Sequence, residues 1–299
     1  MLTHLNPRRI VIGAGYHGCH GVIDIMSRLT GLKKVDLHDE AGWDAAGVGR
    51  GDIVHVETPL NPTGEAYNLE HYAALAHSRG AYLTVDATFA PPGLLDPFLW
   101  GADVVMHSGT KYLGGHSDML CGVLAVKRED WWRGLYTDRV FLGCVLGNME
   151  GWLGLRSLRT MELRVKRQSE NAGELVQWLE SARSGKDTAA GAVVHKLQHA
   201  SLQTSDMHWL KKQMPNGFGP VFALWMETED MARRLPSKLK LFHHATSLGG
   251  VESLIEWRKM SDEHIDPRVL RVSVGIEDWR DLKADFEQGF RALVEEKRA

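Results

Sequence analysis

The chain has 299 residues, of which 43% are hydrophobic, enough to bury a substantial core in one large domain plus a smaller one. Its formal net charge of −3 at pH 7 gives no general attraction to nucleic acid or to an anionic membrane. No apolar run approaches the roughly 18 residues of a membrane-spanning helix, and the start lacks a signal-peptide pattern. The sequence therefore predicts a cytoplasmic globular protein.

Short apolar runs alternate with helical patterns through the first half of the chain. The runs cover residues 10–12, 35–37, 53–56, 82–85, 104–106 and 123–126. Between two of them, residues 68–79 carry apolar side chains at helical spacing and precede Gly80, a pattern typical of a crossover helix. This alternation predicts an α/β fold with a mostly parallel sheet, and we assign residues 1–150 to this large domain.

The second half begins with a predicted long helix from about Asn148, followed by a polar loop over residues 181–188. The predicted helix carries Leu153, Leu155, Leu158, Leu163 and Val165, and a basic cluster of Arg156, Arg159, Arg164, Lys166 and Arg167 that is typical of a solvated face. Strands are predicted at residues 193–194, 221–225 and 270–274, and a final amphipathic helix at 279–297. We assign residues 151–299 to this linking helix and a smaller α/β domain.

The cysteines and histidines give no sign of a metal site. Cys19, Cys121 and Cys144 lack metal-ligand spacing and cannot all pair, so reduced thiols are expected. The histidines form no zinc-like cluster either. The sequence therefore predicts no bound metal.

The most informative stretch for function is residues 104–116, where an apolar strand ends in Ser108 and Thr110 and is followed by a single lysine, Lys111. Partial burial lowers the pKa of a lysine and suits it to Schiff-base chemistry, and hydroxyls can bind a phosphate. Asp86 interrupts an earlier apolar strand, and a buried carboxylate needs a cation. Each residue alone is more often structural. Together they favour pyridoxal 5'-phosphate, with its carbonyl, phosphate and protonated pyridine nitrogen.

The ordered set of motifs resembles the Cys/Met-metabolism, or trans-sulfuration, family of pyridoxal-phosphate enzymes, from about Arg8 to about Asp278. The matching segments are residues 57–63, 86–89, 101–103, 111–118, 247–254 and 271–278. The resemblance implies the fold type I of pyridoxal-phosphate transferases. It also implies γ-elimination or γ-replacement on a sulfur-containing or γ-substituted amino acid, as in cystathionine γ-synthase or γ-lyase, by a homodimer or homotetramer.

The resemblance also assigns roles to cofactor-binding residues. Lys111 would form the Schiff base and carry protons, Asp86 would bind the pyridine nitrogen, and Tyr16 would stack on the cofactor ring. Asn61 would contact the phenolic oxygen, although a turn residue before Pro62 explains it nearly as well. Ser108 and Thr110 would bind the phosphate.

Two further residues match substrate contacts in that family. Arg271 would clamp the substrate α-carboxylate with its planar fork, the alternative being an arginine on an exposed strand face. Ser247 would lie near the same carboxylate, the alternative being a loop or cap residue.

The chain also departs from the family pattern. Ala87 replaces a usual asparagine, and Thr246 stands where cystathionine enzymes often carry a glutamate, which leaves distal specificity open. The family's N-terminal arm and phosphate-cradling loop would precede Met1, so weak cofactor binding and low activity are expected. A non-catalytic relative of the family is therefore the second hypothesis.

A third hypothesis comes from the pattern G-x-G-x-x-G at Gly13, Gly15 and Gly18, which follows a strand, with Asp36 at the next strand. This pattern is typical of dinucleotide sites and indicates a nicotinamide or flavin oxidoreductase. It leaves most of the chain unused, whereas the resemblance assigns Tyr16 in this loop to the pyridoxal ring.

Overall fold

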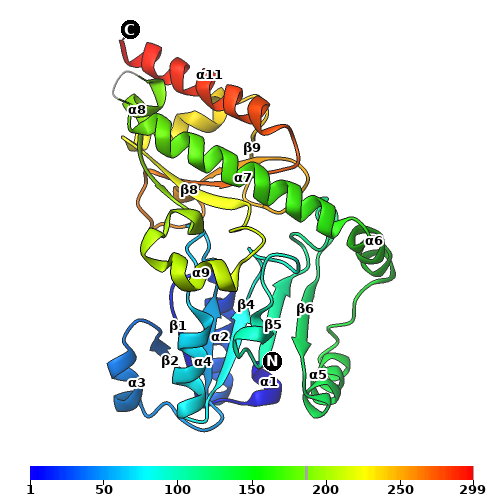
Figure 1. Cartoon of the computed structure of the whole chain (residues 1–299). Coiled ribbons are helices and arrows are strands. Elements are labelled where there is room, and N and C mark those ends of the chain that lie inside the picture. Colours follow the sequence, from blue (N-terminus) through cyan, green and yellow to red (C-terminus); the bar gives the residue numbers. More distant parts are fainter. Residues whose placement is uncertain (186–187, 299) are drawn as a thin grey trace.

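The computed structural model describes residues 1–185 and 188–298, which form two units stacked end to end (Figure 1). The first unit contains a six-stranded sheet in the order β2-β1-β3-β4-β5-β6. Its strands are β1 (Arg9–Ile12), β2 (Lys33–Asp36), β3 (Ile53–Glu57), β4 (Tyr82–Asp86), β5 (Val104–Ser108) and β6 (Gly122–Val126). Neighbouring strands are parallel except β6, which pairs antiparallel with β5. The predicted α/β fold with a mostly parallel sheet is confirmed.

The strand order reverses between β1 and β3, which are parallel neighbours. The strand that follows β1 lies on one side of this pair, and the strands that follow β3 lie on the other. In open α/β sheets, ligands bind outside the carboxyl ends of the strands at such a switch point. The central strand β3 is buried along its first four residues, because helices cover both faces of a parallel sheet. The topology therefore predicts a ligand site at the loops after β1, β3, β4 and β5.

The second unit contains a five-stranded sheet in the order β7-β8-β11-β10-β9. Its strands are β7 (Val194–Gln198), β8 (Val221–Met226), β9 (His243–His244), β10 (Leu254–Trp257) and β11 (Val269–Ser273). Its pairs are antiparallel apart from β9 with β10. The three predicted strands correspond to β7, β8 and β11, whereas β9 and β10 were missed.

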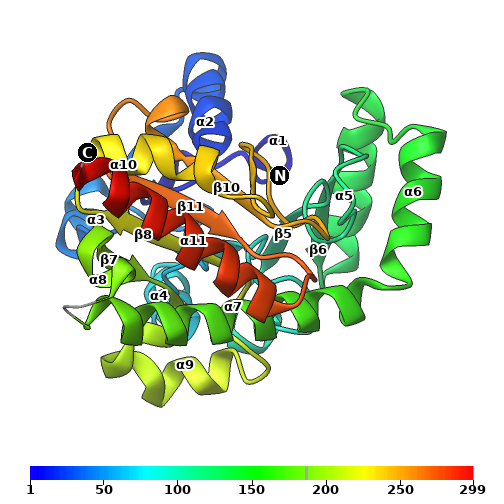
Figure 2. The same ribbon diagram turned by 90° about the horizontal axis from the view of Figure 1, so that it is seen from above.

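Helices surround both sheets, as the view from above shows (Figure 2). The α-helices are α1 (Leu2–Leu5), α2 (His17–Thr30), α3 (Glu40–Ala46), α4 (Leu69–Ser78), α5 (Glu129–Phe141), α6 (Asn148–Leu158), α7 (Met161–Arg183), α8 (Ala189–Val193), α9 (Met207–Gln213), α10 (Glu229–Arg234) and α11 (Trp279–Arg298). The 3-10 turns are η1 (Pro97–Trp100), η2 (Ala200–Leu202), η3 (Thr204–Asp206), η4 (Leu235–Lys238) and η5 (Arg258–Met260). Within the described ranges, no helix has the length and apolar character needed to cross a bilayer.

Two predicted helices are confirmed, and their sequences explain them. Asn68 caps α4 by accepting a hydrogen bond from the backbone of His71, as its place before the helix suggests. In α11, Leu282, Phe286, Phe290 and Leu293 are all buried in the core of the second unit.

The predicted single helix from Asn148 is wrong, because α6 and α7 are separate helices. Arg164 lies at the junction, where its guanidinium donates to the carbonyl of Ser157 at 3.0 Å and to that of Tyr112 at 2.9 Å. These bonds hold the end of α6 against the turn after Lys111. Arg164 is therefore buried, not part of a solvated basic face, which corrects that expectation too.

The predicted loop at residues 181–188 is only partly correct. The helix α7 continues to Arg183, whose side chain pairs with Glu180 one turn earlier. Residues 186–187 lie outside the described part of the chain.

The core of the first unit recruits side chains from the second half of the chain. Ala200, Leu210, Met214 and Val221 are buried with residues of the first sheet and its helices. The proposed boundary near residue 150 stays a prediction, and the packing already joins segments on either side of it.

Candidate active site

The structure brings the residues assigned to the cofactor and the substrate to one cavity of about 400 Å³. These residues are Tyr16, Asn61, Asp86, Ser108, Thr110, Lys111, Ser247 and Arg271. The first six follow or end strands of the first sheet, at the switch-point edge, whereas Ser247 and Arg271 come from the second unit. The cavity therefore lies where the two units meet.

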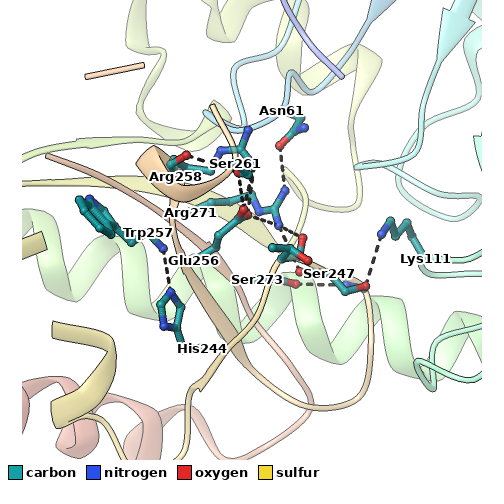
Figure 3. Close-up of polar contacts among 12 residues, drawn as sticks. Asn61, Lys111, His244, Ser247, Glu256, Trp257, Arg258, Ser261, Arg271 and Ser273 are labelled. Carbon is teal, nitrogen blue, oxygen red and sulfur yellow. Dashed lines mark hydrogen bonds and ion pairs between the residues drawn. The ribbon is translucent and has the colours of Figure 1, made fainter. Parts of the chain in front are cut away.

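Lys111 lies in the turn after β5, where its backbone N–H donates to the carbonyl of Ser108. Its Nζ is 3.3 Å from Oγ of Ser247 on the opposite wall (Figure 3). Gly249 permits this approach: it has φ of +84°, and a Cβ there would lie 3.0 Å from the carbonyl carbon of Lys111. Burial, followed by the charge of Arg271, lowers the pKa of Lys111, although Glu256 opposes the shift. The neutral amine is thus more populated than on a solvated lysine.

Asp86 ends β4 beside Glu57, which ends β3 in register with it. Oδ1 of Asp86 accepts hydrogen bonds from Thr88, at 2.9 Å from its N and 2.6 Å from its Oγ1. Burial raises the pKa of both carboxyls, and the charge of Asp86 raises that of Glu57 further, to about 8. A carboxylate that is buried, as that of Asp86 is, favours a cation beside it in the cavity. Carboxylate oxygens accept hydrogen bonds, so Asp86 fits the protonated pyridine nitrogen of pyridoxal phosphate, which donates one.

Glu57 is a site residue that the sequence analysis did not single out. Its Oε2 accepts the N–H of Tyr16 at 2.8 Å, and its Oε1 accepts that of Asn61 at 2.7 Å. A Cβ on Gly15, where φ is +143°, would lie 2.4 Å from Oε2. Glu57 thus packs against the glycine loop of the predicted dinucleotide pattern. The sequence did carry a signal for this site residue: Glu57 is an acidic residue at the end of the predicted strand that precedes the Asp86 strand.

Tyr16, Ser108 and Thr110 line the cavity in different ways. Tyr16 directly precedes α2 and is 48% exposed, and its ring lines the cavity 4.8 Å from the ring of His17. The N–H of Ser108 donates to Oγ1 of Thr88 at 2.8 Å, and Oγ1 of Thr110 accepts the N–H of Cys121 at 3.2 Å. The ring-stacking and phosphate roles of these three residues remain predictions.

Arg271 lies in the middle of β11 and is only 4% exposed, so the alternative of an exposed strand face is wrong. Its Nη1 donates to Oδ1 of Asn61 at 3.0 Å, and its Nη2 donates to the carbonyls of Thr246 and Ser247. Burial lowers its pKa to about 10, against the opposing effect of Glu256, so it remains a cation at neutral pH. The amide of Asn61 therefore orients Arg271, a contact that the sequence did not indicate.

A buried charge network behind Arg271 was also missed (Figure 3). Glu256 in β10 stands directly opposite Arg271, and its Oε2 is 2.6 Å from Nη2. Arg258 also contacts this carboxylate, with Nη1 at 3.1 Å from Oε2, and Ser261 donates to Oε1 at 2.6 Å. Glu256 interrupts an apolar strand just as Arg271 does, and this was its signal in the sequence.

The fold and this site define a fold-type-I enzyme that uses pyridoxal 5'-phosphate. The family model described as "Cys/Met metabolism PLP-dependent enzyme" matches residues 4–291 of the chain. The chain belongs to this family, which makes it a trans-sulfuration enzyme and argues against an oxidoreductase.

Relatives and solved structures agree with this assignment. Cystathionine γ-synthase of Escherichia coli (strain K12) is 36% identical over 86% of this chain and 68% of its own length. Cystathionine β-lyase of Lactococcus lactis subsp. cremoris (strain MG1363) is 32% identical over 88% of this chain and 67% of its own length. The structure of cystathionine γ-lyase from Lactobacillus plantarum, complexed with L-serine, superposes with a TM-score of 0.84 at 29% identity, covering 95% of this chain and 76% of the other.

Proposed function

We propose that this chain eliminates or replaces the γ substituent of a sulfur-containing or γ-substituted amino acid, with pyridoxal 5'-phosphate attached to Lys111. The observation that carries the proposal is one cavity lined by Lys111, Asp86 and Arg271, in which the amine of Lys111 reaches Oγ of Ser247. Relatives named cystathionine γ-synthase and cystathionine γ-lyase support the choice of the γ carbon.

The cavity's own groups would hold the cofactor and the substrate. Asp86 would hold the pyridine nitrogen, Tyr16 the ring face, and Ser108 with Thr110 the phosphate. Arg271 would bind the α-carboxylate, because its planar fork matches two carboxylate oxygens. These contacts would orient the substrate with its α carbon towards the amine of Lys111.

Lys111 is the one lysine among the described lining residues of the cavity, and we assign the proton transfers to it. The bound cofactor supplies an electron sink for the pair left at the α carbon. Nζ of Lys111 would take the α proton, deliver it to the cofactor, and in its neutral form again take a proton from the β carbon. The electrons left at the β carbon would form a second bond to the γ carbon, while the γ substituent leaves with its bonding pair and receives from Lys111 the proton taken from the β carbon. The lowered pKa of Lys111 suits this repeated use.

The carbon at which cystathionine is cleaved can be identified from the products. Elimination at the γ carbon, followed by addition of water, yields cysteine, ammonia and the four-carbon 2-oxobutyrate. Elimination at the β carbon, the reaction indicated by relatives named cystathionine β-lyase, yields homocysteine, ammonia and the three-carbon pyruvate. We expect 2-oxobutyrate from cystathionine, or cystathionine itself from an O-acylhomoserine and cysteine. Pyruvate alone would contradict the γ assignment, and no product from cofactor-loaded protein would favour a non-catalytic relative.

We also propose that the protein acts as a homodimer or homotetramer. The support is a run of exposed apolar side chains on α5, α6 and the segment between them: Trp132, Tyr136, Phe141, Leu142, Val145, Leu146, Met149, Trp152 and Leu155. Contiguous exposed apolar side chains often mark an interface, and a second copy of the chain would cover these residues. Light scattering of the chain and of a Phe141→Asp/Trp152→Asp variant should give an oligomer and a monomer, respectively. A monomeric parent chain would contradict the proposal.

A further inference from the structure

Arg271 does not stand alone in the cavity, because Glu256 already neutralises it. Nη2 of Arg271 lies 2.6 Å from Oε2 of Glu256, and both side chains are almost completely buried. Taken by itself, this pair has no net charge. A substrate carboxylate that entered here would add an uncompensated negative charge to a buried place, which is unfavourable.

Arg258 changes this balance. It follows β10 directly, is 7% exposed, and its Nη1 lies 3.1 and 3.2 Å from the two carboxylate oxygens of Glu256. One carboxylate is therefore shared by two guanidinium groups, and the Arg258–Glu256–Arg271 network carries one net positive charge. A single incoming carboxylate would neutralise it.

Arg258 also has donor capacity left over. Its buried Nε has no hydrogen-bond partner among the described residues, and its side chain lines the same cavity as Lys111. A buried donor without a partner is costly, so it marks a place where a ligand or water completes the bonding.

The backbone around Arg258 fixes its position. Its carbonyl accepts the N–H groups of Ser261 and Asp262, both at 3.0 Å, in the turn η5. Next to it, the indole of Trp257 donates to the carbonyl of Pro267 at 2.7 Å. Arg258 is thus preorganised and does not have to be ordered when a ligand binds.

We propose that Arg258 is a positioning residue that supplies the unpaired positive charge for the α-carboxylate of the substrate, acting on Arg271 through Glu256. This inference rests on the proposed function. Glu256 lies between the two guanidinium groups and contacts both. When the substrate carboxylate binds Arg271, Glu256 stays paired with Arg258. The site then holds two carboxylates and two guanidiniums, with no net charge.

The test compares two ligands that differ only in the carboxylate, L-2-aminobutyrate and propylamine. Their dissociation constants are measured from the visible absorbance of cofactor-loaded protein, and that of L-2-aminobutyrate also by calorimetry on cofactor-free protein. We expect Arg258→Gln to weaken L-2-aminobutyrate about tenfold to a hundredfold and to leave propylamine unchanged. With a reactive substrate, KM should rise while kcat is largely kept.

Three further variants make the charge argument specific. Glu256→Gln/Arg258→Gln restores one net positive charge and should recover most of the affinity. Glu256→Gln alone leaves two cations and should bind L-2-aminobutyrate at least as tightly as the parent chain. Lys259→Gln removes a positive charge from the same turn but outside the cavity lining, and should behave like the parent.

Several outcomes would overturn the proposal. These are unchanged affinity in Arg258→Gln, equal weakening in Lys259→Gln, or a folded double variant as weak as the single one. Weaker binding in Glu256→Gln would also overturn it, even if Arg258→Gln did not fold. A parent chain that binds no cofactor at Lys111 would instead refute the proposed function.

Discussion

The Glu57 carboxyl should make the cofactor-free protein less stable as the pH rises above neutrality. Its pKa is raised to about 8 from an ordinary value of 4.5, by burial and by the charge of Asp86. The folded chain therefore holds a proton that the unfolded chain has released between these two values. The free energy of unfolding that this bound proton contributes is fully present below the unfolded pKa and is lost as the pH rises towards 8.

Buried histidines act in the opposite sense over a lower range. Burial lowers the pKa of His55, His107 and His199 to about 4 from 6.5. The unfolded chain then binds more protons than the folded chain between these values, so stability rises with pH until about 6.5. Between pH 6.5 and 8 the loss at Glu57 continues while the gain from these histidines has ended. At about 1.4 kcal/mol per pH unit, this loss amounts to about 1.5–2 kcal/mol.

The assay is urea unfolding at pH 6.5 and 8, at one protein concentration, for the parent chain and Glu57→Gln. The glutamine cannot ionise, so the parent should lose about 1.5–2 kcal/mol relative to the variant over this interval. Glu129→Gln, on the exposed surface of α5, controls for the loss of any carboxylate. Loading the cofactor, whose pyridine cation would lie beside Asp86, should reduce the difference. Parallel curves for parent and Glu57→Gln, or an equal effect of Glu129→Gln, would refute the reasoning.

The remaining predictions concern one substrate contact and two packing contacts. Arg271→Lys keeps the charge but loses the planar fork, so kcat/KM should fall about tenfold to a hundredfold while the cofactor absorbance survives; unchanged kinetics would mean that another residue holds the carboxylate. Phe286→Ala removes a buried ring whose centroid lies 4.5 Å from that of Phe242 and 5.5 Å from that of Phe290. The free energy of unfolding, measured in urea, should fall by about 3–5 kcal/mol, and a fall under about 1 kcal/mol would count against tight packing. Arg164→Leu leaves the buried carbonyls of Tyr112 and Ser157 without their donor and should cost about 2–4 kcal/mol by the same assay, whereas neutrality would show that the α6–α7 junction does not depend on them.

The sequence predicted site residues where one polar side chain breaks an apolar strand. Asp86 and Arg271 have this pattern, and Lys111 follows such a strand directly. Glu57 and Glu256 have the same pattern and were passed over, because their meaning depends on the residues opposite them. The register of β10 against β11, which sets Glu256 opposite Arg271, cannot be read from the irregular stretch before β10.

Long-range contacts explain the other errors. At the break between α6 and α7, Arg164 reaches the carbonyl of Tyr112, 52 residues earlier, and no local pattern reports such a bond. Helical periodicity alone continued through the junction, and predicted one helix. Arg258 escaped notice for a similar reason, since it lies in a short 3-10 turn and gains its significance only from Glu256 and the cavity.

Covalent mapping of the cofactor tests the central claim most directly. The purified protein is incubated with pyridoxal 5'-phosphate, treated with borohydride to fix the cofactor to the lysine that holds it, digested, and analysed by mass spectrometry. Lys111→Ala, treated in the same way, is the matched control. The account predicts a pyridoxyl group on the peptide that contains Lys111, and none in the variant. A pyridoxyl group on another lysine, with Lys111 unmodified, would contradict it.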